Sequence, residues 1–306
     1  MTASSVPPAP HPTSLQRWII AARPRTLPAA SAPVIATIGL ALYHGHFRLD
    51  PALACLLCAL LLQIGANFAN DVFDYQKGVD TRDRLGPLRV TQAGLLTQRQ
   101  VYAGMLVVFG LAALLGVYLA WTAGWPVIAI GVFSILVALA YSGGPYPLGY
   151  HGLGEVFVFL FFGLAACCGT YFVLTGAFDP ISLWVAVPMG LLTVAILIVN
   201  NLRDIETDRA TAKRTLAVIF GAEWTRREYI AVIVLAYLAP LLMWVTGSGP
   251  VWVLLTYLSI PRALALRKTL YLETGRPLNK ALAGTGQLEL WYGLLIFAGL
   301  VIPLFM

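Results

Sequence analysis

Two groups of Asn and Asp residues stand directly after apolar runs, and their spacing suits the binding of cations. The first acidic cluster consists of Asn67, Asp71 and Asp74, and the second acidic cluster consists of Asn200, Asp204 and Asp208. Intervals of three or four residues place side chains on one face of a helix. Carboxylate and amide oxygens suit hard cations, and Mg²⁺ in proteins often binds substrate phosphates as well. We therefore interpret these six residues as ligands of two or more Mg²⁺ ions around a diphosphate.

Basic residues follow both clusters closely. They are Lys77, Arg84 and Arg89 after the first cluster, and Lys213 and Arg214 after the second. Arg can bind phosphate oxygens through two nitrogens and Lys acts as a point charge, so these five residues are candidates to bind the diphosphate. The alternative is that the acids cap helices and the bases anchor them at a membrane surface. Because the basic residues share their loops with the acids, nucleic acid is not an expected partner.

The elements that carry the clusters are predicted to be transmembrane helices. Of the 306 residues, 59% are hydrophobic and 11% are charged, and the mean hydropathy is +0.78, whereas a soluble domain carries about 25% charged residues. We expect an all-α integral membrane protein in which residues 15–306 form one domain and residues 1–14, rich in Pro, Ser and Thr, form a disordered tail. Nine apolar runs are predicted to span the membrane, at residues 27–43, 53–68, 101–121, 127–141, 156–175, 183–199, 230–246, 251–266 and 288–305.

The distribution of positive charge predicts the orientation of these helices. With nine spans, 19 of the 20 Lys and Arg residues fall on one side of the membrane and only Arg48 falls on the other. The positive-inside rule then places the N-terminus in the cytoplasm and the C-terminus outside. Both acidic clusters lie on the cytoplasmic side. Their four aspartates would cost roughly 10–14 kcal/mol in contact with lipid, so we expect them to face a hydrated, protein-lined space.

Several stretches resemble the UbiA superfamily of membrane prenyltransferases, and most closely its branch that prenylates 1,4-dihydroxy-2-naphthoate in menaquinone synthesis. They are the two acidic clusters with residues 23–28, 67–80, 86–89, 92–97, 141–149 and 200–216. The resemblance covers nearly the whole chain and implies nine helices enclosing a central cavity. It also implies Mg²⁺ dependence, a polyprenyl diphosphate donor, a dihydroxynaphthoate acceptor that loses CO₂, and a bacterial inner membrane with the active site facing the cytoplasm.

The resemblance also suggests residues for the substrate pocket. Asn70, Asn201 and Arg25 are candidates to line it, and Tyr141 and Tyr146 are candidates to stabilise an allylic cation.

Two assignments stay open. Asp74 and Asp80 are alternative metal ligands, and Glu155 either handles protons or caps a helix. Some superfamily members carry a Tyr-x-x-x-Lys element where this chain has Tyr141 and no following Lys, which argues against a basic diphosphate ligand from this loop.

Three other functions compete with this interpretation. Another prenyltransferase of the superfamily would accept hydroxybenzoate, homogentisate or haem. An ion-coupled transporter would place its acids near the middle of the membrane. A CDP-alcohol phosphotransferase needs Asp-Gly, Ala-Arg and further spaced Asp residues in one segment, and this pattern is absent from the sequence.

Overall fold

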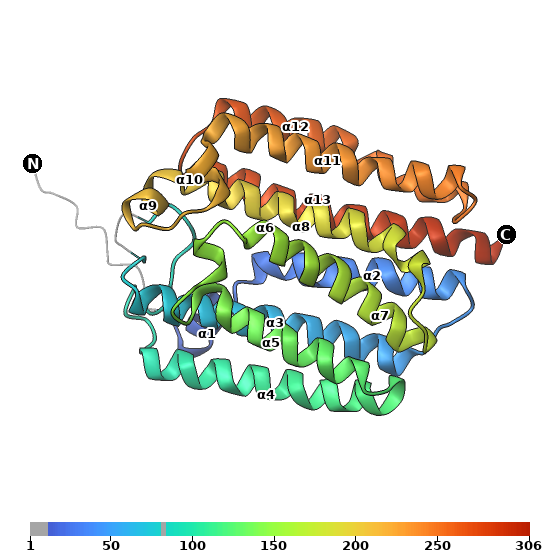
Figure 1. Ribbon diagram of the computed structural model, residues 1–306, viewed down its shortest axis with the longest axis horizontal. Coiled ribbons are helices and arrows are strands. Elements are labelled where there is room, and N and C mark those ends of the chain that lie inside the picture. The colour runs from blue at the N-terminus through green and yellow to red at the C-terminus, as the bar shows by residue number, and fades with distance from the viewer. Residues whose placement is uncertain (1–11, 81–83) are drawn as a thin grey trace, which may run out of the picture.

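The computed structural model describes residues 12–80 and 84–306, and all regular secondary structure in these ranges is helical (Figure 1). The first half contains α1 (Ser14–Ala22), η1 (Pro24–Thr26), α2 (Leu27–Tyr43), α3 (Leu49–Gln76), α4 (Gln98–Ala123), α5 (Pro126–Ser142), η2 (Leu148–Tyr150), α6 (Gly154–Val158) and η3 (Phe159–Ala165). The second half contains α7 (Ala166–Thr175), η4 (Pro180–Ser182), α8 (Leu183–Arg203), α9 (Ile205–Ala210), α10 (Leu216–Phe220), α11 (Ala222–Val245), η5 (Val251–Ser259), α12 (Ile260–Leu272), α13 (Leu278–Val301) and η6 (Ile302–Phe305).

Among the described residues, seven helical stretches are long and apolar enough to cross a membrane. They are Ser14–Tyr43, Leu49–Gln76, Gln98–Ala123, Gly154–Thr175, Pro180–Arg203, Ala222–Val245 and Leu278–Phe305. The predicted spans at 127–141 and 251–266 fall on helical segments as well, the first on the shorter apolar helix α5 and the second on η5 and α12. The protein is therefore an all-helical membrane protein, and the count of nine crossings stays a prediction. The predicted tail lies mostly outside the described residues, although Ser14 begins α1.

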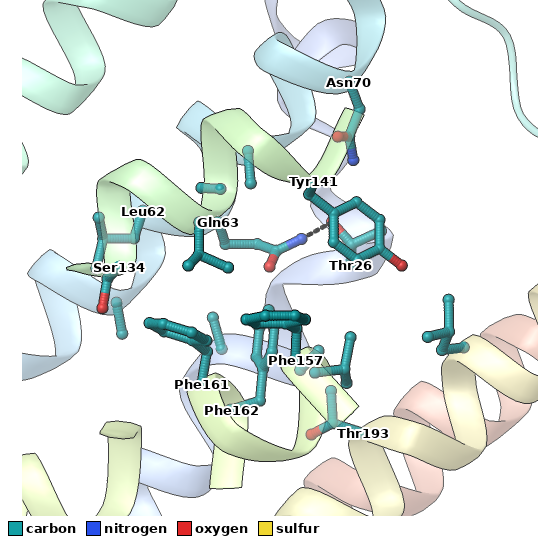
Figure 2. A pocket seen from close by; sticks show the side chains of 18 of the residues that line it. Thr26, Leu62, Gln63, Asn70, Ser134, Tyr141, Phe157, Phe161, Phe162 and Thr193 are labelled. Carbon is teal, nitrogen blue, oxygen red and sulfur yellow. Dashed lines mark hydrogen bonds between the residues drawn. The ribbon is translucent and has the colours of Figure 1, made fainter. Parts of the chain in front are cut away.

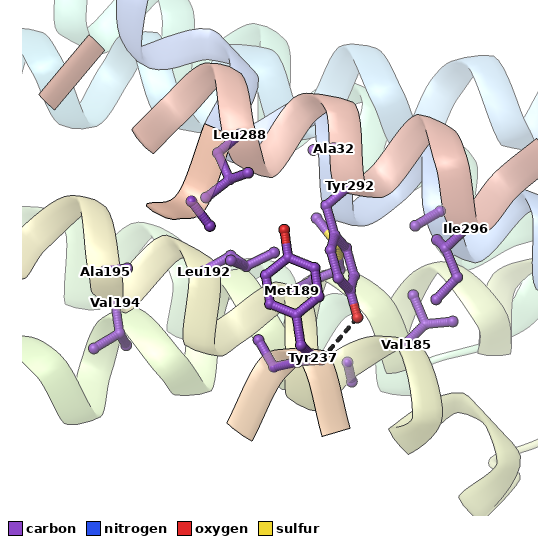
Figure 3. Packing of buried hydrophobic residues seen from close by; sticks show 14 of the residues in the cluster. Ala32, Val185, Met189, Leu192, Val194, Ala195, Tyr237, Leu288, Tyr292 and Ile296 are labelled. Atoms are coloured by element: carbon purple, nitrogen blue, oxygen red, sulfur yellow. Dashed lines mark hydrogen bonds between the residues drawn. The ribbon is translucent and has the colours of Figure 1, made fainter. Parts of the chain in front are cut away.

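The long helices lie side by side along the long axis of the molecule, with the short helices α9 and α10 together at one end (Figure 1). The acidic clusters lie at this end, where α3 ends at Gln76 and α8 ends at Arg203. The main core is formed by α2, α8, α11 and α13, and Figure 3 shows Met189, Leu192 and Tyr292 packed there. The hydroxyl of Tyr292 donates to the carbonyl of Ala236 at 2.8 Å, which satisfies a polar group that would otherwise be costly to bury.

A close helix crossing positions one wall of the interior. The stretch between α6 and α7, η3, is a π-helix, and Gly163 within it packs against Gly190 of α8. A Cβ atom at Gly163 would lie 2.8 Å from the Cα atom of Gly190, so no larger residue fits without moving a helix. Wide π turns are frequent at functional sites, and Phe161 and Phe162 of this turn line the central cavity.

Candidate active site

A cavity of about 770 Å³ opens between the helices that carry the two acidic clusters. Asp74 and Cys55 of α3 both line it, and they lie 19 residues apart, which is about 28 Å along a helix. Polar residues line the end beside Asp74, whereas the end beside Cys55 is lined by apolar residues such as Leu119 and Val127. The cavity thus suits a molecule with a charged head and a long apolar tail. Figure 2 shows its middle part, where three phenylalanines face α3.

The first acidic cluster divides between two faces of α3. Asp74 and Asn70, one turn apart, line the cavity. Asn67 and Asp71 form the neighbouring stripe of the helix, and neither lines the cavity. Asp71 accepts hydrogen bonds from the backbone nitrogens of Val90, at 3.1 Å, and of the next residue, at 3.0 Å. The spacing of four and then three places Asn67, Asp71 and Asp74 within about 60° of one another on α3, but only Asp74 lies at the edge of this face that borders the cavity.

Two arginines after α3 pair with Asp74, near the end of this helix, and with Asp80, in the loop that follows it. Arg89 donates to Asp74 at 2.8 Å and lies 3.3 Å from Asp80, and Arg84 also pairs with Asp80. Both arginines line the cavity, whereas Asp80 is buried behind them. Burial raises the pKa of Asp80 to about 6, although the Arg84 charge opposes the shift. Of the two alternatives for the first cluster, Asp74 is therefore the carboxylate that faces the cavity.

The second acidic cluster meets the cavity as a unit. Asn200, Asp204 and Asp208 all line it, across the junction between α8 and α9. Arg203 holds this junction in place, since its guanidinium donates to Asp204 at 2.8 and 2.5 Å and to Asn200 at 2.9 Å. The third nitrogen of Arg203 donates at 2.8 Å to Asn279 of α13, which also lines the cavity. Arg203 is fully buried, so it acts as a structural counter-charge to Asp204.

Asp208 combines a cationic partner with a free oxygen. Lys213 lies 3.4 Å from its Oδ1, and its Oδ2 is buried without a hydrogen-bond partner among the described residues. Burial raises the pKa of Asp208, and the Lys213 charge opposes the shift. No three His, Cys, Asp or Glu side chains within residues 12–80 and 84–306 converge into a ready metal site. An unpartnered carboxylate oxygen in a cavity that Asn70 and Asn200 also line fits Mg²⁺, whose coordination is usually completed by phosphates and water.

Tyr150 joins the two clusters and was missed by the sequence analysis. Its hydroxyl donates to Asp74 at 2.6 Å, and the ammonium groups of Lys77 and Lys213 lie 5.1 and 5.7 Å from the centre of its ring. Its backbone carbonyl accepts from the backbone nitrogen of Arg214 at 2.9 Å. Burial and the neighbouring Asp74 charge raise the pKa of the Tyr150 phenol, so it remains a neutral donor. The only signal in the sequence was its place next to the Gly- and Pro-rich stretch 141–149.

The remaining candidates divide between the cavity wall and its surroundings. Those that line the cavity are Asn70, Asn201, Tyr141, Arg25, Arg84, Arg89 and Lys213, together with Asp74 and the second cluster. Those that do not line it are Asn67, Asp71, Asp80, Lys77, Arg214, Tyr146 and Glu155. Tyr146 is 58% exposed and stacks on His151 at 3.6 Å, and Lys77 donates to two backbone carbonyls of the same loop. Glu155 accepts a hydrogen bond of 2.9 Å from Asn201.

Comparisons with known proteins identify the family of the chain. The model of the UbiA prenyltransferase family matches residues 32–292. The chain is 39% identical, over 86% of its length and 88% of the relative, to a 1,4-dihydroxy-2-naphthoate octaprenyltransferase of Mycobacterium tuberculosis. A UbiA homolog from Aeropyrum pernix superimposes with a TM-score of 0.68 at 17% identity, covering 90% of this chain and 98% of that one. A UbiA homolog from Archaeoglobus fulgidus bound to GPP and Mg²⁺ gives 0.67 at 14% identity, covering 92% and 99%. The chain belongs to the UbiA prenyltransferase family.

Proposed function

We propose that the protein transfers a polyprenyl group from polyprenyl diphosphate to 1,4-dihydroxy-2-naphthoate, with loss of CO₂, in menaquinone biosynthesis. The observation that carries the proposal is the cavity itself, which extends about 28 Å along α3 from a polar end with oxygen ligands and cationic side chains to an apolar end. The name of the Mycobacterium tuberculosis relative supplies the acceptor. Hydroxybenzoate and homogentisate remain the competing acceptors within the same family.

The polar end would hold the diphosphate together with two or more Mg²⁺ ions. The proposed ligands are Asp74, Asn70 and the second acidic cluster, because these residues line the cavity and Asp208 has an oxygen without a partner among the described residues. The A. fulgidus homolog was solved with GPP and Mg²⁺, which supports this choice of ion. The bound ions would supply Lewis-acid stabilisation of the leaving diphosphate. In this proposal Asp71 holds the loop at Val90 in place, and Asn67 holds the segment between α1 and α2 through Ala22 and Thr26.

The side chains of the protein would divide the remaining work. Arg84, Arg89 and Lys213 face the cavity and can exchange their carboxylate partners for phosphate oxygens, which stabilises the negative charge that develops as the allylic C–O bond breaks. Tyr141 lines the cavity at the polar end of the channel and can present its ring to the allylic cation. Attack by the electron-rich ring carbon then forms the new C–C bond, and departure of the ring carboxylate as CO₂ restores aromaticity.

The channel explains the membrane location in this proposal. A prenyl chain stays among apolar side chains while its diphosphate remains at the cytoplasmic surface. We therefore expect an inner-membrane protein with nine crossings, a cytoplasmic N-terminus and an external C-terminus. A reporter fused after Met306 should read as external, and a cytoplasmic signal would overturn this orientation.

The test uses purified full-length protein with Mg²⁺, a polyprenyl diphosphate and each acceptor in turn, with products identified by mass spectrometry. We expect a prenylated, decarboxylated naphthalene product that disappears when the metal is chelated. Asp74→Asn and Asp204→Asn should each abolish turnover, whereas Glu206→Gln, on the exposed surface of the same loop, should leave turnover unchanged. A product formed only from hydroxybenzoate, or near-normal turnover in both Asp variants, would refute the proposal.

A further inference from the structure

A buried glutamine in the wall of the cavity has an oxygen without a hydrogen-bond partner. Gln63 of α3 lines the cavity, and its Oε1 is buried without a partner among the described residues. A buried acceptor left unpaired is destabilising, so a ligand that supplies a donor here would be favoured. Gln63 lies 11 residues before Asp74 on the same helix, which is about 16 Å deeper in the cavity. This separation leaves room for a diphosphate and a reacting carbon between the two side chains.

The hydrogen bonds of its neighbours determine which way the Gln63 amide faces. The hydroxyl of Thr26 donates its only hydrogen to the carbonyl of Arg23 at 3.0 Å, so Thr26 can only accept from other groups. The nitrogen of Gln63 donates to this hydroxyl at 3.2 Å.

The hydrogen bonds of Asn67 fix the same orientation of the Gln63 amide. Its nitrogen donates to the carbonyl of Ala22 at 3.0 Å, so its oxygen faces Gln63 and accepts from the Gln63 nitrogen at 3.4 Å. A flipped amide would set oxygen against oxygen at both places, and the free Oε1 is therefore a consequence of the network.

The surroundings of this oxygen are aromatic. Figure 2 shows the Gln63 amide between Tyr141 and the three phenylalanines 157, 161 and 162, with its nitrogen toward Thr26. All four aromatic residues line the cavity. Flat apolar walls suit an aromatic ring, and a hydrocarbon chain offers nothing that an amide oxygen can accept. A phenolic hydroxyl supplies the missing donor, whereas a carboxylate or a quinone carbonyl does not.

We propose that this pocket binds the ring of the aromatic acceptor, with Gln63 Oε1 accepting a hydrogen bond from a ring hydroxyl. The inference rests on the proposed function and specifies it further. The pocket would take an acceptor in its reduced, hydroxyl-bearing form, and it would bind the corresponding quinone, which has no donor, more weakly. Gln63 is thus a binding residue for the acceptor, and Thr26 and Asn67 are positioning residues that orient its amide.

The test compares binding of 1,4-dihydroxy-2-naphthoate with binding of its two mono-O-methyl ethers. Isothermal titration is performed on the purified full-length protein with Mg²⁺ and pyrophosphate present, so that no reaction occurs. In the wild type, we expect the diol to bind roughly tenfold more tightly than at least one ether. Gln63→Met, close in volume to glutamine, should bind the diol and that ether equally. Gln76→Met, on the exposed end of the same helix, should keep the wild-type preference.

Binding of Mg²⁺ and pyrophosphate in each variant checks that the protein is folded. Gln63→Asn shortens the side chain, and this second variant should also lose the preference for the diol over the ether. A wild-type preference in a folded Gln63 variant would overturn the inference, as would equal binding of diol and ethers by the wild type. Failure of the wild type to bind any naphthoate while it still binds pyrophosphate would overturn the proposed acceptor, and this inference with it.

Discussion

Replacement of Tyr150 by Phe removes one hydroxyl from the junction of the two acidic clusters. The structure predicts a specific consequence, because this hydroxyl donates to Asp74 at 2.6 Å while the ring carries the contacts with Lys77 and Lys213. Phe keeps the ring and therefore both cation contacts. The variant isolates a single hydrogen bond, the one that orients a carboxylate facing the cavity.

The size of the effect follows from the role of that hydrogen bond. Groups that orient a metal-binding carboxylate typically change metal affinity 10- to 100-fold when they are removed. We therefore expect Tyr150→Phe to raise the Mg²⁺ concentration for half-maximal activity roughly 10- to 100-fold. Since the pKa of the Tyr150 phenol lies above its ordinary value, the hydroxyl stays protonated at neutral and moderately alkaline pH, and the difference from wild type should not change between them.

The assay is a Mg²⁺ titration of turnover, together with a titration of Mg²⁺ and pyrophosphate binding that does not depend on the acceptor. Tyr75→Phe is the matched control, because Tyr75 is 39% exposed and adjoins Asp74 in sequence without lining the cavity. Tyr150→Leu, which also removes the ring, should in addition weaken pyrophosphate binding. If Tyr150→Phe showed the Mg²⁺ dependence of wild type in both titrations, the argument that this hydrogen bond positions Asp74 would be wrong.

Three further predictions concern packing, the channel and pH. Gly163→Ala places a Cβ atom 2.8 Å from the backbone of Gly190. The variant should therefore be less stable by about 1–3 kcal/mol and have a lower melting temperature in detergent. An unchanged melting temperature would contradict the close crossing of the two helices. Gly169 is buried and lines the apolar part of the cavity, and a Cβ atom there would make only ordinary van der Waals contacts. Gly169→Leu should therefore raise the KM for long prenyl diphosphates, and this increase should be roughly tenfold larger than the increase for geranyl diphosphate. Equal increases for both substrates would argue against the channel. Burial raises the pKa of Asp80 from its usual 3.8 to about 6, so between these pH values the folded state holds a proton that the unfolded state has lost. The stability of the protein should therefore fall as the pH rises through this interval. Asp80→Asn should remove this dependence of the melting temperature on pH, and a dependence that remains in the variant would assign the titration to another group.

Local periodicity predicted the helices and much of the candidate site. The seven long helices lie where apolar runs were found, and the four-residue spacing of Asn200, Asp204 and Asp208 brings all three to the cavity. The same reasoning was less accurate for α3, where four-residue steps define two adjacent stripes and the cavity faces the stripe of Asn70 and Asp74. A single-residue difference in register decides which stripe is inside, and helical spacing alone carries no information about it.

Contacts between distant segments could not be predicted in this way. The hydrogen bond between Tyr150 and Asp74 joins residues 76 positions apart, and the bond between Arg203 and Asn279 spans the same distance. Such pairs depend on how whole helices pack. Gln63 was overlooked for a related reason, because a glutamine inside an apolar helix becomes informative only when the partners of both its amide atoms are known.

The pairing of charges has a consequence for how the protein is made. Asp80 pairs with an arginine four positions away, Asp204 with its direct neighbour, Asp208 with a lysine five positions away, and Asp74 with an arginine fifteen positions away. These four carboxylates therefore each have a counter-charge within fifteen residues, whereas Asp71 pairs with Arg23, 48 positions earlier in the chain. A segment whose charges are paired costs less free energy to place at a membrane surface than a segment with unpaired charges. Both acidic clusters thus have protein counter-charges that balance their aspartates before any metal is bound, so we expect the helices to assemble first and the metal to bind afterwards.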